Sequence, residues 1–140
     1  MSKQLSVFLE NAPGRLDAVL STLAEAGIDI HAFSIAERTE TGILRMLVND
    51  PDKGVAVLSA AGMTSKAAEV ILVKIGDAPG SAIRPVRVLA EAGVNVEYAF
   101  AYENRTKDAA ILILRVNDNA LAEEALSGAG IAVVALSDIF

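Results

Sequence analysis

Residues that commonly carry catalysis are scarce in this chain. It has no cysteine, which excludes disulfides, thiolate catalysis and cysteine-based zinc sites, and its one histidine is His31. No metal-ligand spacing, glycine-rich phosphate loop or nucleophile–base–acid set occurs. We therefore expect no enzyme, no metal site and no cofactor.

Some polar side chains could still serve in binding. His31 follows Asp29 by two residues and projects to the same face of a predicted strand, so it could line a site or be a hydrogen-bonded filler. Lys74 stands in the middle of a predicted central strand, where burial would demand a partner such as a carboxylate. Tyr98 and Tyr102 could cover a ligand or pack in an interface.

The sequence contains an internal duplication, and the fold of its two copies must position these residues. Asn11-Ala12-Pro13-Gly14 returns as Asp77-Ala78-Pro79-Gly80, and Leu23–Gly27 returns letter for letter as Leu89–Gly93. Both matches have a displacement of 66 positions, from Gly14 to Gly80 and from Gly27 to Gly93. Later matches, such as Gly62 with Gly130, have a displacement of 68, which places a two-residue insertion near 104–108. We expect two domains, 1–69 and 70–140.

Hydrophobic periodicity predicts the elements of the first copy. Alternation over 5–10 predicts a strand, and Asn11 and Pro13 predict the cap and first position of a helix that ends at Gly27. Its apolar face is Leu16, Val19, Leu20 and Leu23. Strands follow at 27–37 and 43–48, a helix is capped by Asp50 and closed by Gly62, and a strand covers 63–68. This β-α-β-β-α-β order predicts an α+β, ferredoxin-like unit whose antiparallel strands are backed by two helices.

The second copy repeats this order. Strands are predicted at 70–75, 94–103, 109–116 and 131–136, with a helix at 81–92 and another capped by Asp118. The inner stripe of the last helix is predicted as Leu121, Ala125 and Ala129. Pro85 replaces the position of Val19, so we expect a distorted helix entry and two unequal sites.

The strands at 31–35 and 96–102 have apolar side chains on both faces, so we expect both faces of the sheets to be covered. Tyr98, Phe100 and Tyr102 stand where the first copy has small residues, while Phe33 and Ile35 stand where the second copy has alanine. Packing of unit on unit and of chain on chain follows, and we expect a homodimer.

Composition excludes several classes of partner. The net charge of −6 argues against nucleic acid and anionic membranes, and the N-terminus lacks a signal pattern. No apolar run approaches the roughly 18 residues of a membrane span. We expect a cytoplasmic protein with no membrane or nucleic-acid partner.

With these motifs, the chain resembles two tandem ACT domains, a small-ligand regulatory module. The resemblance rests on two motifs. The first is Asn/Asp-x-Pro-Gly after a strand. The second, the restart motif, is a Gly-apolar-Asn/Asp-apolar segment that begins the next strand after the helix, Gly27-Ile28-Asp29-Ile30 and Gly93-Val94-Asn95-Val96. The resemblance implies a non-catalytic regulator that binds an amino acid at interfaces between modules, like the regulatory domains of phosphoglycerate dehydrogenase, aspartate kinase and the acetolactate synthase small subunit.

The resemblance also implies a set of ligand-binding positions. In the first copy they are Leu9, Asn11, Ala12, Pro13, Gly14 and Asp29, with His31 beside them; in the second they are Ile75, Asp77, Ala78, Pro79, Gly80 and Asn95. Asp29 or Asp77 would accept from the ligand's ammonium, and the backbone amides after Pro13 and Pro79 would bind its carboxylate. Serine-binding members carry histidine where this chain has Leu9 and Ile75, so serine specificity does not follow.

Two other functions stay open, and a third is contradicted by the charge. The turns at 11–14 and 77–80 would be needed for any strand-to-helix connection, so the chain could be a ligand-free structural or regulatory subunit of a metabolic enzyme. An acylphosphatase-like hydrolase would need an arginine in the strand-to-helix loop, where Arg15 is the candidate and Ser81 stands in the second copy. An RNA-binding sheet would need a basic face, which the acidic balance contradicts.

Overall fold

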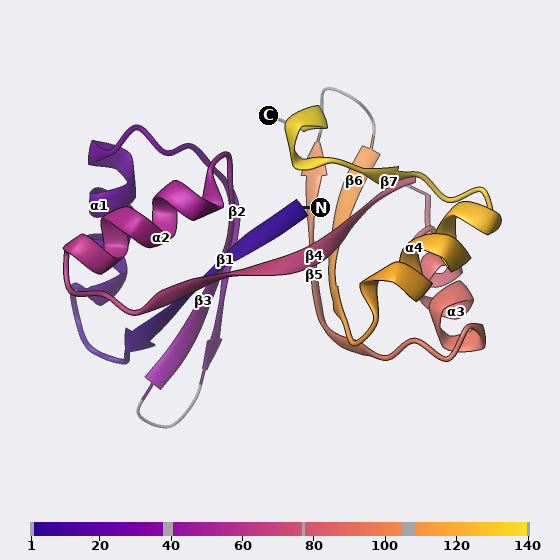
Figure 1. The fold of residues 1–140 in the computed structure, drawn as a ribbon, viewed down its shortest axis with the longest axis horizontal. Helices are drawn as coiled ribbons and strands as arrows, with labels where there is room; N and C mark the ends of the chain where they lie inside the picture. The colour runs from indigo at the N-terminus through magenta and orange to yellow at the C-terminus, as the bar shows by residue number, and fades with distance from the viewer. Residues whose placement is uncertain (1, 38–40, 77, 105–108, 140) are drawn as a thin grey trace. The chain divides into compact units, whose positions relative to one another are not determined.

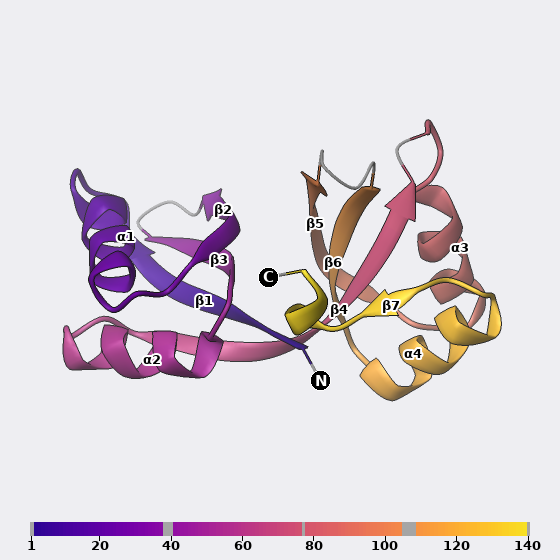
Figure 2. The same cartoon turned by 90° about the horizontal axis from the view of Figure 1, so that it is seen from above.

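A computed structural model describes residues 2–37, 41–76, 78–104 and 109–139. The chain divides into two compact units, one of Lys3–Ala68 and one of Glu69–Phe140 with Met1–Ser2. In each unit two helices lie side by side on one face of the strands (Figure 1, Figure 2). Each unit is an antiparallel, ferredoxin-like α+β repeat, as the sequence predicts.

The first unit has the strand order β2-β3-β1-β4. Its elements in chain order are β1 (Ser2–Glu10), α1 (Arg15–Glu25), β2 (Ile30–Glu37), β3 (Thr41–Val48), α2 (Pro51–Ala60) and β4 (Ser65–Gly76). The antiparallel registers place Leu5 opposite Met46 and Ile35 opposite Leu44.

The second unit has the corresponding order β5-β6-β4-β7. After β4 its elements are α3 (Ile83–Glu91), β5 (Val96–Asn104), β6 (Ala109–Val116), α4 (Asn119–Gly128), β7 (Val133–Val134) and a 3-10 turn (Leu136–Asp138). In this unit β4 pairs antiparallel with both β6 and β7.

The boundary between the repeats lies inside a strand. The sequence predicted separate strands at 63–68 and 70–75, but β4 is one strand of 12 residues. No glycine, proline or asparagine occurs between Ser65 and Ile75, so nothing in the sequence breaks the extended conformation. The described part of the chain therefore has seven strands, and not the eight predicted.

The last predicted strand is also shorter than expected. Only Val133 and Val134 of the predicted 131–136 pair as β7, and the chain then turns at Leu136–Asp138. The Asp138 carboxylate accepts from the Ala135 backbone N–H at 2.9 Å, and the Leu136 N–H donates to the Ser2 hydroxyl at 3.1 Å. The local bond to Asp138 and the long-range bond to Ser2 occupy backbone N–H groups that strand pairing would otherwise use, so the strand ends here.

Two helix caps agree with the prediction, and the start of α1 does not. Asp50 caps α2 as predicted, accepting from the Lys53 N–H at 3.1 Å with Pro51 in the first turn, and Asp118 caps α4 in the same way. The prediction of Asn11 as a cap and Pro13 as the first helical residue is wrong. The chain instead reverses at Gly14, which has a left-handed φ of 83°, and α1 begins at Arg15 without a side-chain cap.

Pro85 explains why α3 begins later than α1. Relative to the 66-residue displacement, α3 starts two positions late, at Ile83, so Pro85 is its third residue. The first backbone N–H groups of a helix have no intrahelical partner, so a proline there removes no hydrogen bond. The predicted distortion therefore takes the form of a helix that starts two residues late.

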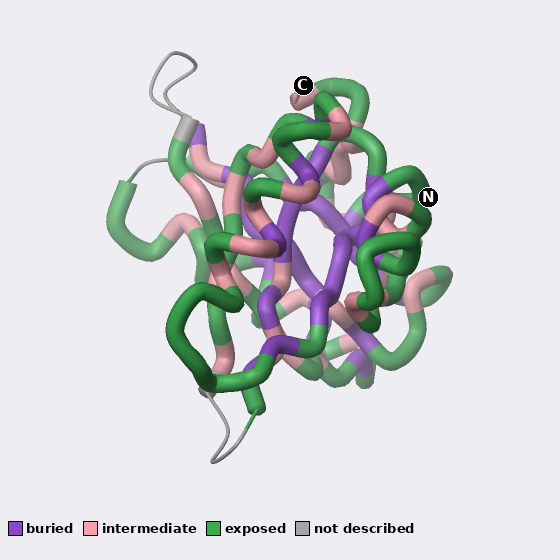
Figure 3. The backbone as a smooth tube through the Cα atoms, turned by 90° about the vertical axis from the view of Figure 1, so that its left-hand side faces the viewer, coloured by how far each residue is buried: buried purple, intermediate pink, exposed green. Residues whose placement is uncertain are grey.

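Each unit has its own hydrophobic core between sheet and helices. The first centres on Leu5, Leu44, Met46, Leu23 and Leu58, and the second on Ile71, Leu114, Leu89 and Leu126. Buried residues gather along the strands and the inner helix faces (Figure 3). The inner face of α4 is Ala122 and Leu126, so the predicted inner position of Leu121, which is 39% exposed, is wrong.

Residues on the sheet face opposite the cores are partly buried too. Leu47 and Ile113 alternate with core residues and are fully buried, whereas Phe8 on the same face of β1 is 50% exposed. The expectation that both faces are covered therefore holds for part of this face. Burial raises the pKa of Tyr102, which is opposite Ile111 on the same face. Phe33 and Ile35 lie on the helix side of β2, where they are 48% and 47% exposed.

The exchange of large and small residues between copies is confirmed by register. Ile35 is opposite Leu44, and Ala101 is opposite the corresponding Leu112, so a large residue in the first unit matches a small one in the second. A homodimer that would cover Phe33 and Ile35 remains a prediction.

Candidate functional site

A first cavity lies at the end of β1 in the first unit. It has a volume of about 180 Å³ and combines the turn after β1 with α1, β2 and β3. Three predicted ligand positions, Leu9, Asn11 and Ala12, line it, together with Glu10, Leu16, Ile35, Thr41 and Gly42. Pro13 and Gly14 are exposed in the turn and are not among its lining residues.

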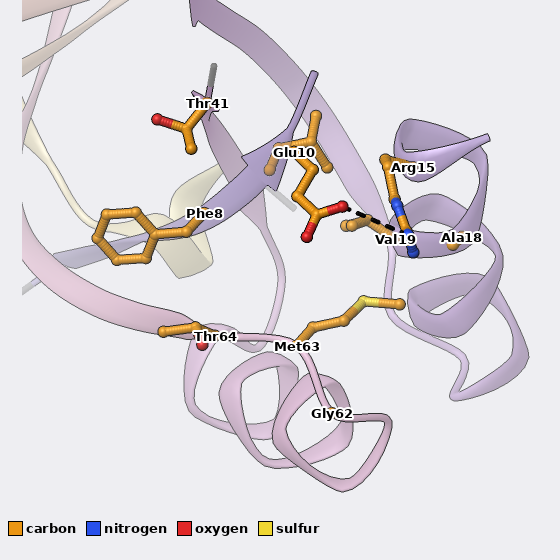
Figure 4. Close-up of a pocket in the computed structure, with 10 residues that line it drawn as sticks. Phe8, Glu10, Arg15, Ala18, Val19, Thr41, Gly62, Met63 and Thr64 are labelled. Carbon is orange, nitrogen blue, oxygen red and sulfur yellow. Dashed lines mark ion pairs between the residues drawn. The ribbon is translucent and has the colours of Figure 1, made fainter. Parts of the chain in front are cut away.

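A second cavity of about 300 Å³ uses the same end of β1. Leu9, Glu10 and Thr41 line both cavities. The further residues here are Phe8, Arg15, Ala18, Val19, Gly62, Met63 and Thr64, from β1, α1 and the turn after α2 (Figure 4). The end of β1 therefore borders two hollows within one unit.

Glu10 and Arg15 form an ion pair at this place. The Arg15 Nη2 atom lies 3.4 Å from Glu10 Oε2, and both side chains are exposed. Figure 4 shows the two groups pointing toward one another beside Val19 and Met63. They meet because the left-handed turn at Gly14 brings the first residue of α1 back to the last residue of β1. The pair offers a carboxylate and a guanidinium next to open space.

The second unit has a cavity at the repeat-related place. It has a volume of about 520 Å³ and lies between the end of β4, the start of α3 and the turn after α4. Its lining includes three predicted positions, Ile75, Pro79 and Gly80, and also Lys74, Gly76, Ser81, Arg84, Pro85, Gly130, Ile131 and Ala132. The Ala78 carbonyl accepts from the Ser81 hydroxyl at 2.7 Å, and Asp77 lies outside the described residues.

The backbones of the two repeat-related cavities correspond closely. The Phe8 N–H donates to the Thr64 carbonyl at 3.0 Å, and the Lys74 N–H donates to the Ala132 carbonyl at 3.1 Å. Lys74 is exposed, so the expectation that burial would demand a partner for it does not apply.

The side chains differ although the backbones correspond. At a displacement of 66, Phe8 becomes Lys74, Glu10 becomes Gly76, Arg15 becomes Ser81 and Ala18 becomes Arg84. Glu10 and Arg84 were not predicted as site residues from the sequence. The signal that could have found them is the charge difference between copies at these four positions.

Asp29, Asn95 and His31 lie away from these cavities. Ile30 is opposite Val48, whereas Glu10 is opposite Thr41, so Asp29 and Asn11 lie at opposite ends of their sheet. The structure therefore does not bring Asp29 and Asn11 together within one unit. A site that uses both would need residues from different units, and this stays a prediction.

The starts of β2 and β5 have a structural hydrogen-bond pattern in common. Asn49 Oδ1 accepts from the Asp29 N–H at 3.0 Å, and the Asn49 N–H donates to the Asp29 carbonyl at 3.1 Å. Asn117 and Asn95 repeat both bonds at 2.9 and 3.2 Å. The Asp29 carboxylate lies 3.9 Å from His31 Nδ1. The restart motif thus has a structural role in joining the start of one strand to the end of its neighbour.

Neither a metal cluster nor a membrane helix occurs in the described part of the chain. No group of three or more His, Asp or Glu side chains among the described residues could hold a metal ion. None of the helices formed by these residues is long and apolar enough to cross a membrane.

Comparisons with known proteins agree with the repeat and the fold. Solved structures similar to this chain include protein BT0572 from Bacteroides thetaiotaomicron, with 33% identity, a TM-score of 0.91 and coverage of 98% of this chain and 94% of that one. The ligand-free regulatory subunit of aspartate kinase from Thermus thermophilus has 17% identity, a TM-score of 0.70 and coverage of 93% and 92%. The corresponding subunit from Thermus flavus has 15% identity, a TM-score of 0.60 and coverage of 92% and 94%.

The last two similarities, at their low identity, concern the fold alone. A search of curated proteins found no match. The family described as ACT domain pair matches residues 1–140, the whole chain. The protein therefore belongs to the ACT domain pair family, whose tandem modules are regulatory.

Proposed function

We propose that this ACT domain pair is a non-catalytic regulator that binds a free amino acid beside Glu10 and Arg15. The observation that carries the proposal is the exposed Glu10–Arg15 ion pair, which lies beside the cavities at the end of β1. A free amino acid has an ammonium and a carboxylate on one carbon. The Glu10 carboxylate can accept from the ammonium, and the Arg15 guanidinium can donate to the carboxylate.

The pair can exchange its internal contact for contacts with a ligand at low cost. An exposed ion pair contributes only about 0–1 kcal/mol to stability, so separating the two groups requires little free energy. The apolar walls, Leu9 and Leu16 in one cavity and Val19 and Met63 in the other, suit a small aliphatic side chain. The 300 Å³ volume is at the lower end for ligand pockets, as a single amino acid requires.

The rest of the predicted site enters through oligomerisation. We propose a homodimer in which Asp29 and His31, or Asn95, of one unit approach the turn residues of another, and a metabolic enzyme as the regulated partner. The similarity in fold to regulatory subunits of aspartate kinase supports an enzyme partner of this kind.

A thermal-shift panel of the twenty amino acids tests the binding proposal. At a hundredfold excess over its dissociation constant, the cognate amino acid adds about 2.7 kcal/mol of stability, which raises the melting temperature by several degrees. Glu10→Gln and Arg15→Gln should each weaken the affinity for this amino acid at least about tenfold, because each removes one charge-assisted contact. Glu25→Gln is the matched control, since Glu25 is exposed at the end of the same helix and outside both cavities. A flat response to all twenty amino acids contradicts the proposal.

The alternative is a ligand-free subunit that holds a partner enzyme. Phe8, Phe33 and Ile35 favour it, because these large apolar side chains of the first unit are 47–50% exposed. Under this alternative the panel is flat, and association with the enzyme does not respond to amino acids.

A further inference from the structure

The two repeat-related cavities carry opposite chemistry. We propose that the cavity of the second unit binds a small anion, a ligand with a phosphate or carboxylate group and no required ammonium, through Lys74 and Arg84. The proposal concerns a different cavity from the Glu10–Arg15 site and does not depend on amino-acid binding there.

Charge is the first argument. Lys74 and Arg84 both line the cavity, and no acidic side chain occurs among the described residues of its lining. An adjoining hollow shares Gly80 and Arg84 with it and is lined by both Arg87 and Glu91, so the excess of positive charge belongs to the cavity of Lys74 and Arg84 alone. The chain as a whole has a net charge of −6, so two cations with no acidic side chain among the described lining residues run against its overall balance. A cleft lined by one sign of charge concentrates ligands of the opposite sign.

The comparison between copies is the second argument. The first unit has Glu10 next to Arg15, which suits a zwitterion, whereas the second unit has Gly76 at the position of Glu10. Lys74 and Arg84 replace Phe8 and Ala18, and Ser81 replaces Arg15. The cavity of the second unit thus has two cations and no carboxylate among its described residues, where that of the first unit has one of each. The second cavity therefore favours a ligand with net negative charge.

The positions of the two cations fit this role. The Arg84 Nη2 atom donates to the Ala129 carbonyl at the end of α4, which holds the guanidinium at the cavity wall and leaves its other N–H groups for a ligand. Among the described residues, no side chain forms an ion pair or hydrogen bond with the Lys74 ammonium. An anion between the two would receive donors from opposite elements, β4 and α3.

The test is a titration of the full chain, followed by amide chemical shifts, with inorganic phosphate in one arm and succinate in the other. Sodium chloride keeps the ionic strength constant, so that general screening does not count as binding. We expect saturable shifts at Gly76, Gly80, Ser81 and Gly130. The stronger arm identifies whether phosphate or carboxylate is the preferred group. Absence of saturable shifts in both arms, or shifts confined to other residues, overturns the proposal.

Variants locate the site. Lys74→Gln should weaken the better anion about tenfold and leave folding unchanged, since Lys74 is exposed and its ammonium contacts no charged side chain of the described structure. Arg84→Gln should weaken it at least as much, and Arg84→Lys, which keeps the charge, should recover part of the affinity. Lys66→Gln removes an exposed lysine outside the cavity and serves as the control. Equal affinity in Lys74→Gln and the wild type overturns the proposal even if Arg84→Gln unfolds the protein.

The Glu10→Gln variant separates this proposal from the proposed function. It should keep full affinity for the anion while it loses the amino acid. Loss of anion binding in Arg15→Gln, which removes the guanidinium of the first unit, would place the anion there and contradict the assignment.

Discussion

Single glycines near the end of α4 show how backbone conformation decides the effect of a side chain. A Cβ added at Gly128, the last residue of α4, or at Gly130 would meet no atom within 4 Å, but Gly130 has a left-handed φ of 73°. We expect Gly128→Ala to raise the free energy of unfolding by about 0.5 kcal/mol, because alanine favours the helix. Gly130→Ala should lower it by about 1 kcal/mol, because an L side chain is strained there. Urea denaturation of the pair measures both, and equal effects of the same sign would contradict the argument.

Residue by residue, the site was only partly predictable. Leu9, Asn11 and Ala12 line a cavity, because the repeated turn marks where a strand ends and a helix follows. Glu10 and Arg15 were not recognised as a pair, because their proximity depends on the left-handed turn at Gly14 and not on their spacing alone. Amino-acid binding at any of these residues remains a prediction for the thermal-shift panel to test.

At the scale of elements, helix caps give a prediction that separates structure from function. Asp50 accepts from the Lys53 N–H, so Asp50→Ala should cost about 1 kcal/mol of stability. Asn11 does not cap α1, so Asn11→Ala should change stability by less than about 0.5 kcal/mol while it alters ligand affinity. Thermal denaturation with and without the amino acid measures both effects. A loss in Asn11→Ala as large as that in Asp50→Ala would show that the turn is chiefly a structural cap.

Most elements could be predicted because their signals are local. The strand at 109–116 and the caps Asp50 and Asp118 agree with the structure, since alternation and capping act within a few residues. The fusion of two predicted strands into β4 could not be read in this way, because where a strand passes from one sheet partner to another depends on distant residues. Likewise, α3 starts late because Pro85 has no backbone N–H. It therefore fits among the first residues of the helix, whose N–H groups have no intrahelical partner.

At the scale of the whole molecule, the duplication gives two cores that are equivalent in construction. Leu58 and Leu126 occupy the same place in each, at a displacement of 68, and both are fully buried. Units of about 66–70 residues bury enough surface for only marginal stability, so each depends strongly on its own core. The division into domains 1–69 and 70–140 remains a prediction, and the core leucines provide a test of it.

We expect Leu58→Ala to lower the protection of first-unit amides against hydrogen exchange by about 2–5 kcal/mol, because truncation removes buried methyl groups and leaves a cavity. Amides of β5 and β6 should change much less, since Leu58 belongs to the first core and their residues Val96 and Leu114 belong to the second. Leu126→Ala is the matched variant and should show the reverse pattern. β4 contributes to both units, so its amides before Glu69 should follow Leu58→Ala and those after Val70 should follow Leu126→Ala. An equal loss of protection throughout the chain in either variant would show that the two repeats unfold as one cooperative unit.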